Sequence, residues 1–137
     1  MVVTIVRADQ SAIKDSIKRS IRVLGGKCNL NFIDTELIND MRYMFYDFEF
    51  NGDISNWNVE NVTNMKYMFC GSKFNGGISG WDVRNVTDMF SMFYGSKFNG
   101  NISSWNVEKV TNMGFMFHGC PLKNKPEFQP KFKKEIL

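Results

Sequence analysis

The chain has 137 residues, 43% of them hydrophobic, and a formal net charge of +3. This length suits one domain with a modest core and leaves little room for a second domain. Residues 1–27 carry six Lys/Arg and two acidic residues. Residues 28–120 carry six Lys/Arg and ten acidic residues, and residues 121–137 carry five Lys/Arg and two acidic residues. Two basic ends flanking an acidic middle favour solubility and protection of the exposed ends of the fold, with nucleic-acid or anionic-surface binding through the basic termini as the alternative.

Targeting and cysteine patterns exclude several classes. No stretch approaches the length of a membrane span, and the apolar residues at the N-terminus are too few for a signal peptide. The three cysteines form no CxxC or Cys/His pair, so we expect reduced thiols and no metal site. We therefore expect a cytoplasmic protein, or a surface or secreted one if a leader precedes the sequence as given.

Residues 1–27 are predicted to form an N-terminal strand and an amphipathic capping helix. Residues 2–6 form an apolar run that suits an edge strand. Asp9 and Gly25 stand at the N-cap and C-cap positions of a helix over 9–24, with basic residues on its outer surface. Its apolar side chains recur at helical spacing: Ile13, Ile17, Ile21 and Leu24.

Residues 28–120 contain four tandem units of 24 residues. The tripeptide Phe-Asn-Gly at 50–52 recurs at 74–76 and 98–100, and a weaker first copy precedes them. The alternation Trp57-x-Val59 predicts a short extended segment. The block Met-x-x-Met-Phe begins at Met41, Met65, Met89 and Met113. Its spacing of three and four predicts a short helix or 3₁₀ turn that ends at a glycine.

These units predict an α/β repeat fold. A single unit cannot bury its apolar face alone, so neighbouring units must stack. We expect a right-handed solenoid like that of leucine-rich repeats, with one short parallel strand and one short helix or 3₁₀ turn per repeat and an N-terminal capping helix.

The repeat resembles the BspA-like leucine-rich repeats, also described as the mycoplasma-lipoprotein surface repeat. The residues that carry the resemblance are Phe-Asn-Gly-Asp-Ile-Ser-Asn-Trp-Asn-Val at 50–59, Val-Thr-Asn-Met-x-x-Met-Phe at 62–69, and their copies over about residues 28–120. The resemblance implies a solenoid that belongs to surface or secreted proteins, many of them adhesins. It supplies no catalytic residues.

Residues 121–137 are predicted to be a basic C-terminal cap or tail. They contain all three prolines of the chain, which cannot continue a hydrogen-bonded ladder. Phe128 and Phe132 either fold back over the last repeat or belong to a flexible tail.

Candidate binding residues occupy positions that vary between repeats, because packing fixes the others. The predicted strand side carries a mainly acidic strip, which we call the acidic strip: Asp34, Glu36, Asn58, Glu60, Asp82, Arg84, Asn106 and Glu108. The predicted helical side carries aromatic candidates: Tyr43, Tyr67, Tyr94 and Phe115. Tyr46 and His118 stand in the same column as Tyr94. Aromatic residues at such positions are the usual anchors of interfaces.

The sequence predicts a non-catalytic module that binds a protein partner, with no cofactor. No nucleophile–base or carboxylate pair emerges from the repeat, so we expect no enzyme activity. Calcium binding by the strip is a lesser option, since no compact ligand loop is present. Alternatives are an inhibitor encoded by a virus or mobile element, and a fragment of a surface adhesin. We expect a monomer or weak oligomer.

Overall fold

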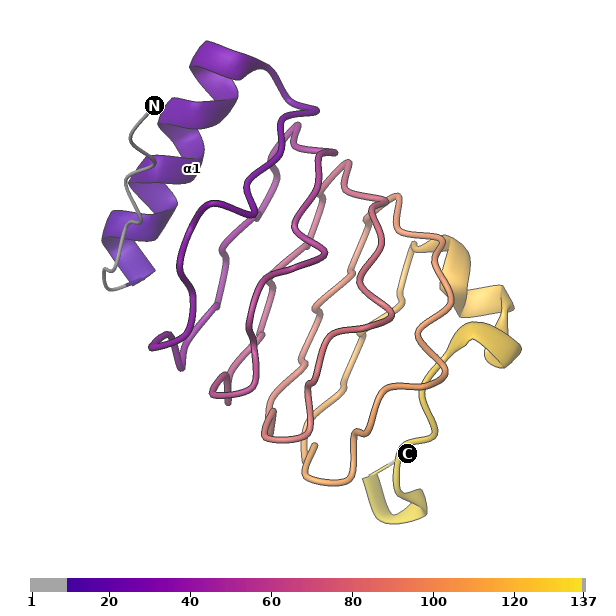
Figure 1. Cartoon of the computed structure of the whole chain (residues 1–137). Helices are drawn as coiled ribbons and strands as arrows, with labels where there is room; N and C mark the ends of the chain where they lie inside the picture. The colour runs from indigo at the N-terminus through magenta and orange to yellow at the C-terminus, as the bar shows by residue number, and fades with distance from the viewer. Residues whose placement is uncertain (1–9, 137) are drawn as a thin grey trace.

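The computed structural model describes residues 10–136, which form one α-helix, a stack of irregular turns and three short 3₁₀ helices. The predicted strand over 2–6 and Asp9 lie outside these residues. The elements are α1 (Gln10–Leu24), η1 (Pro121–Asn124), η2 (Pro126–Phe128) and η3 (Lys134–Ile136). Figure 1 shows α1 along one end of the stack, the C-terminal segment across the other end, and the turns side by side between them.

Helix α1 covers the first turn of the stack with an apolar face. Ile13 and Ile17 are fully buried, and Ile21 packs against the same core. Leu24, predicted on this stripe, is instead 63% exposed. The helix ends there, because Gly25 has a φ of 93° and its N–H donates to the Ile21 carbonyl (2.9 Å). The glycine C-cap thus lies where the sequence predicts it.

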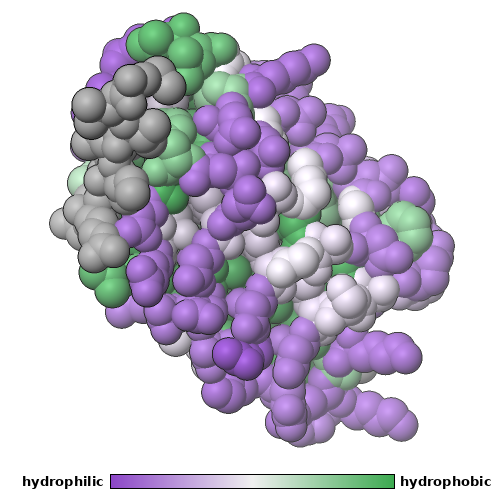
Figure 2. Space-filling view, viewed as in Figure 1, coloured by the Kyte–Doolittle hydropathy of each residue, from purple (hydrophilic) through white to green (hydrophobic). Residues whose placement is uncertain are grey.

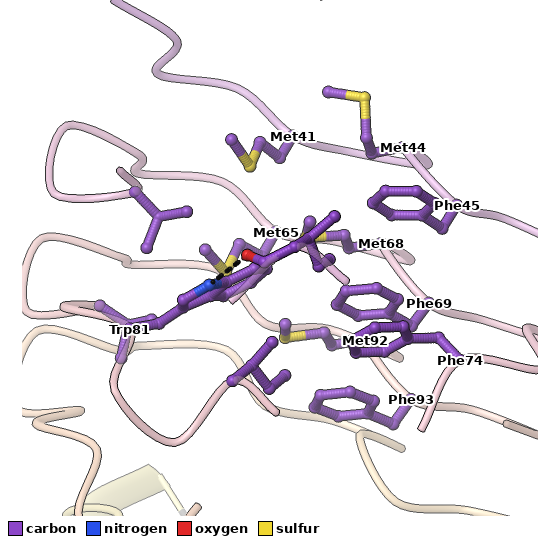
Figure 3. Close-up of a cluster of buried hydrophobic side chains, with 14 of the residues drawn as sticks. Met41, Met44, Phe45, Met65, Met68, Phe69, Phe74, Trp81, Met92 and Phe93 are labelled. Atoms are coloured by element: carbon purple, nitrogen blue, oxygen red, sulfur yellow. Dashed lines mark hydrogen bonds between the residues drawn. The ribbon is translucent and has the colours of Figure 1, made fainter. Parts of the chain in front are cut away.

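The core consists of columns of like side chains, one from each turn. Phe45, Phe69 and Phe93 stack in parallel, with ring centroids 5.4 and 5.5 Å apart (Figure 3). A second column joins Phe74 to Phe98 at 6.2 Å. Every one of these five rings is at most 1% exposed. Because stacked aromatic pairs add to the free energy of burial, each turn stabilises its neighbours.

The tryptophans connect successive turns by buried hydrogen bonds. The indole Nε1–H of Trp81 donates to the Ile54 carbonyl of the preceding turn at 3.1 Å, as the dashed line in Figure 3 marks. Trp57 and Trp105 make the equivalent bonds at 2.9 and 3.0 Å. A buried indole requires such a partner. The Trp column therefore sets the register of the stack.

The Met-x-x-Met-Phe blocks are not helical, so this part of the sequence prediction is wrong. In the first block the N–H groups of Met41, Tyr43 and Phe45 donate to carbonyls of the next turn at 2.9, 3.1 and 2.9 Å. The N–H groups of Met44 and Tyr46 donate within the block, to carbonyls three residues earlier. Helical bonding from i to i−4 is impossible when alternate N–H groups point to a neighbouring turn, and the φ of 60° at Tyr43 is incompatible with a 3₁₀ turn. Each block is a succession of β-turns.

The neighbouring turns are in parallel register, but the bridges between them are isolated. They join Asp40 to Asn64, Asn64 to Asp88 and Asp88 to Asn112, with one further bridge from Asn29 to Asp53. Among residues 10–136 these single bridges do not extend into a β-strand. The segment Trp57-x-Val59, where the sequence predicts a strand, contains no β-bridge. The right-handed, leucine-rich-repeat-like solenoid stays a prediction.

The C-terminal segment folds back onto the last turn. The Ile102 N–H donates to the Phe128 carbonyl at 2.9 Å. Lys125 Nζ donates to the Asn99 side chain at 2.8 Å. Phe128, Phe132 and Ile136 pack against the core. Of the two alternatives predicted for this segment, the structure has the cap.

Figure 2 shows a mainly hydrophilic outer face in which the hydrophobic patches are small and separated.

Candidate binding surface

Seven ring-bearing residues form a continuous group along the outside of the Met-x-x-Met-Phe blocks, which we call the aromatic band. Its members are Tyr43, Tyr46, Tyr67, Phe90, Tyr94, Phe115 and His118. Ring centroids lie 4.9 Å apart from Tyr43 to Tyr67, 5.5 Å from Tyr67 to Phe90, and 5.9 Å from Phe90 to Phe115. His118 continues the band, 6.2 Å from Phe115 and 5.0 Å from Tyr94. The band thus crosses all four turns.

The turn geometry of each block sends its residues to opposite sides. The first, fourth and fifth positions of the second block, Met65, Met68 and Phe69, are fully buried. The third position has a left-handed backbone in every block, with φ values of 60°, 58°, 52° and 56° at Tyr43, Tyr67, Ser91 and Phe115. A residue other than glycine in the left-handed conformation is strained by about 1–2 kcal/mol. Aromatic residues therefore occupy a position that the backbone alone would give to glycine or asparagine.

The band is accessible, and its composition differs from that of the core. Tyr43, Tyr46, Tyr94 and Phe115 are 40, 45, 41 and 64% exposed, and they are half of the large hydrophobic residues exposed within residues 10–136. All four tyrosines of the chain are in the band, whereas the buried aromatic residues are Phe and Trp. Tyrosine combines an apolar ring with a hydroxyl that bonds to a partner or to water.

Basic side chains lie along and at both ends of the band. Lys66 Nζ lies 5.6 Å from the ring centroid of Tyr67 and 5.6 Å from that of Phe90. At one end a hollow of about 450 Å³ is lined by Gln10, Ser11, Lys14, Arg42 and Tyr43. Burial, followed by the charge of Lys18, lowers the pKa of Lys14. At the other end Lys123 shares a hollow of about 320 Å³ with Phe115 and His118.

The acidic strip is largely a structural feature. The side-chain oxygens of its Asx column accept the backbone N–H two residues later, at 3.0, 3.0, 3.2 and 3.1 Å for Asp34, Asn58, Asp82 and Asn106. Such Asx turns fix the local bend of the chain. Glu36, Glu60 and Glu108 are exposed.

The strip is also less acidic than its residue types suggest. Arg84 Nε lies 3.4 Å from an Asp82 carboxylate oxygen, so the third repeat presents a neutral pair. The acidic strip has fewer groups for a partner than the sequence indicates.

A second Asx column contains Asp53 and Asn101, which accept the N–H and the hydroxyl of Ser55 and Ser103 in the same way. The Ser55 hydroxyl, the Ser55 N–H and the Asn31 side chain together hold the pKa of Asp53 below its ordinary value. These carboxylates and amides shape the turns.

The described part of the chain holds no arrangement suited to metal chemistry. Within residues 10–136 no three His, Cys, Asp or Glu side chains gather where a cation would bind. Cys28, Cys70 and Cys120 are buried and unpaired, and burial raises the pKa of each thiol. No helix in this part of the chain has the length and apolarity needed to cross a bilayer.

Sequence reasoning identified four members of the band and omitted three. Tyr46 and His118 were in a column already recognised as variable, and their contacts with Tyr43 and Phe115 are what join them to the band. Phe90 was missed because its column carries Arg42, Lys66 and Gly114 in the other repeats. Ser91, which takes the place of an aromatic residue in the third repeat, is buried.

One family of known proteins matches this chain. The family described as "Mycoplasma protein of unknown function, DUF285" matches residues 18–129, which include the C-terminal part of α1, all four repeats, η1 and η2. No curated protein and no solved structure matches the chain.

Proposed function

We propose that this chain, which belongs to the Mycoplasma family DUF285 of proteins of unknown function, is a non-catalytic module that binds a protein partner through the aromatic band. The observation that carries the proposal is a continuous row of accessible rings at positions that core packing does not require. The inward positions of the same blocks already complete the core. The outward rings are therefore available for recognition.

The composition of the band suits a protein interface. Tyrosine is enriched at interfaces, where it supplies a large contact area at a low cost in conformational entropy. Contacts with neighbouring rings already restrict the band's side chains: Tyr43 stacks on Tyr67, and Tyr94 stacks on His118. A surface ordered before binding loses less entropy when the partner docks.

The aromatic band is a better candidate than the acidic strip. The Asx column of the strip bonds to its own backbone, and Arg84 neutralises Asp82. Ion pairs between a partner and the remaining exposed glutamates would contribute little to affinity, because salt screens exposed charges. The rings of the band offer apolar area as well as hydroxyl groups.

The repeat motif supports a relation to the BspA-like repeats, and with it a leucine-rich-repeat-like solenoid. Parallel bridges that recur every 24 residues agree with that architecture. Such repeats present extended binding surfaces, because each unit adds the same strip of surface to the last. An adhesin and a small inhibitor both bind in this way, and the identity of the partner distinguishes them.

The test is affinity capture from cells that carry this protein, with three forms of the chain. The band variant carries Tyr67→Ser and Phe115→Ser, because the third repeat already has serine at that position (Ser91). The strip variant carries Glu60→Gln and Glu108→Gln. We expect a protein that the unchanged chain and the strip variant retain and the band variant loses. Retention by the band variant, or loss from the strip variant alone, would contradict the proposal.

A further inference from the structure

Several ring faces of the aromatic band are used within the band. The planes of Tyr43 and Tyr67 lie 18° apart and stack, and those of Tyr94 and His118 lie 21° apart and stack. Phe90 meets Tyr67 and Phe115 edge to face, at 80° and 90°. The faces that stack in these pairs are closed to a partner, which therefore also meets ring edges and hydroxyl groups.

Ring edges and hydroxyl hydrogens carry partial positive charge. The quadrupole of an aromatic ring is negative on its face and positive at its edge. A carboxylate is attracted to such an edge and accepts a hydrogen bond from a tyrosine hydroxyl. A flat sugar or another aromatic ring prefers an open face, and stacking closes several faces of this surface.

Full positive charges reinforce this preference along the length of the band. Lys66 lies in its middle, over Tyr67 and Phe90. Lys14 and Arg42 line the hollow at one end, and Lys123 lines the hollow at the other. A partner that lies along the band meets a cation at each end and at the centre.

Two carboxylates, Asp40 and Asp88, directly precede Met-x-x-Met-Phe blocks and are engaged by the protein's own groups. Asp40 accepts the Arg42 backbone N–H at 3.0 Å and pairs with Arg42 Nε at 3.0 Å. Asp88 accepts the Phe90 N–H at 2.9 Å. Arg42 and Asp40 therefore form a neutral pair, and Lys14 supplies the positive charge at that end of the band.

We infer that the partner presents an acidic segment, in which Asp or Glu alternates with apolar side chains, along the aromatic band. The apolar side chains contact the rings, and the carboxylates meet the ring edges, the tyrosine hydroxyls and the three groups of cations. The inference rests on the proposed function and names the chemical class of its partner.

The test is a selection of random 16-residue peptides displayed on phage, with the full chain immobilised. Enriched peptides are then synthesised, labelled and titrated by fluorescence anisotropy. We expect them to carry net negative charge and apolar residues, and to bind less tightly as salt rises. Lys66→Gln should weaken them by about fivefold or more. Lys109→Gln removes the same charge near the acidic strip, where Lys109 bonds to Asn85 (2.8 Å), and should leave affinity unchanged.

The outcomes separate this inference from the proposed function. Neutral or basic peptides that bind the unchanged chain and fail to bind the band variant would overturn the acidic class and leave the proposed function standing. Peptides that bind the band variant equally well would overturn both. Failure of the selection to enrich any peptide counts against both as well.

Discussion

Replacing Phe115 by glycine should give a more stable protein than replacing it by alanine. Phe115 has a φ of 56° and is 64% exposed. Both substitutions remove the same ring and its edge contacts with Phe90 and His118. They differ in the backbone, because alanine keeps a Cβ in the left-handed region and glycine does not.

The expected difference follows from two opposing terms. A left-handed residue with a Cβ costs about 1–2 kcal/mol. Glycine avoids this strain, but it also gives the unfolded chain more conformational freedom, which lowers the stability of the glycine variant by about 0.4–1 kcal/mol. The glycine variant should therefore be more stable by about 0.5–1 kcal/mol, or roughly 2–4 °C in Tm for a domain of this size.

The assay is thermal and urea unfolding of both variants, followed by circular dichroism. The matched control is the pair Ser104→Gly and Ser104→Ala, since Ser104 is exposed and has no positive φ. There the order should reverse, with alanine the more stable. If Phe115→Ala is as stable as Phe115→Gly, the left-handed turn at the third position of the block is refuted.

Three further predictions concern the stack. Gly52→Ala should destabilise the protein by about 1–3 kcal/mol in urea unfolding, because a Cβ there would overlap a carbonyl oxygen of the preceding turn. Its control is Gly77→Ala, where a Cβ meets nothing within 4 Å and stability should change by less than about 0.5 kcal/mol. Equal effects of the two substitutions would contradict the packing described. Phe69→Ala should cost about 3–5 kcal/mol in the same assay, since the ring is fully buried between two others; a loss below about 1 kcal/mol would mean that the column does not stack. Asp53 has a lowered pKa, so its stabilising effect is present above its ordinary value of 3.8 and is lost as pH falls through the lower folded value. The urea midpoint of Asp53→Asn, which keeps an Asx acceptor as at Asn101, should therefore fall less on acidification than that of the unchanged chain, and an identical fall would contradict this.

The sequence was sufficient to predict what depends on periodicity. The recurrence of Trp and Phe at 24-residue intervals indicated stacked units, and those side chains form the columns of the core. The apolar spacing of α1 and the glycine after it predicted the capping helix. These features succeed because burial and glycine's backbone freedom act locally or repeat identically.

The same reasoning failed on the Met-x-x-Met-Phe blocks. A spacing of three and four is shared by a helix and by a chain of β-turns that buries the same side chains. What decides between them is hydrogen bonding to the next turn, as from the Tyr67 N–H to the Phe90 carbonyl (3.0 Å). That bond depends on a residue 23 positions away, and tyrosine gives no sign of a left-handed backbone.

The candidate site was partly predictable for a related reason. Variable columns identified Tyr43, Tyr67 and Phe115, but Phe90 joined them only through three-dimensional contact. Conversely, Asn58 and Asn106 varied between repeats only within the types that accept an Asx hydrogen bond. A column that varies but keeps one chemical property, such as a side-chain acceptor, indicates a structural role. A column whose chemical properties change between repeats indicates a role in recognition.

Fluorine labelling of the tyrosines tests the central claim most directly, because all four tyrosines lie in the aromatic band and all three tryptophans lie in the core. The chain is produced with 3-fluorotyrosine, and separately with 5-fluorotryptophan as the matched control. ¹⁹F spectra are then recorded as a captured partner or a selected peptide is added. We expect tyrosine signals to shift or broaden to saturation while the tryptophan signals stay in place. Tyrosine signals that remain unchanged in the saturated complex would contradict binding through the aromatic band.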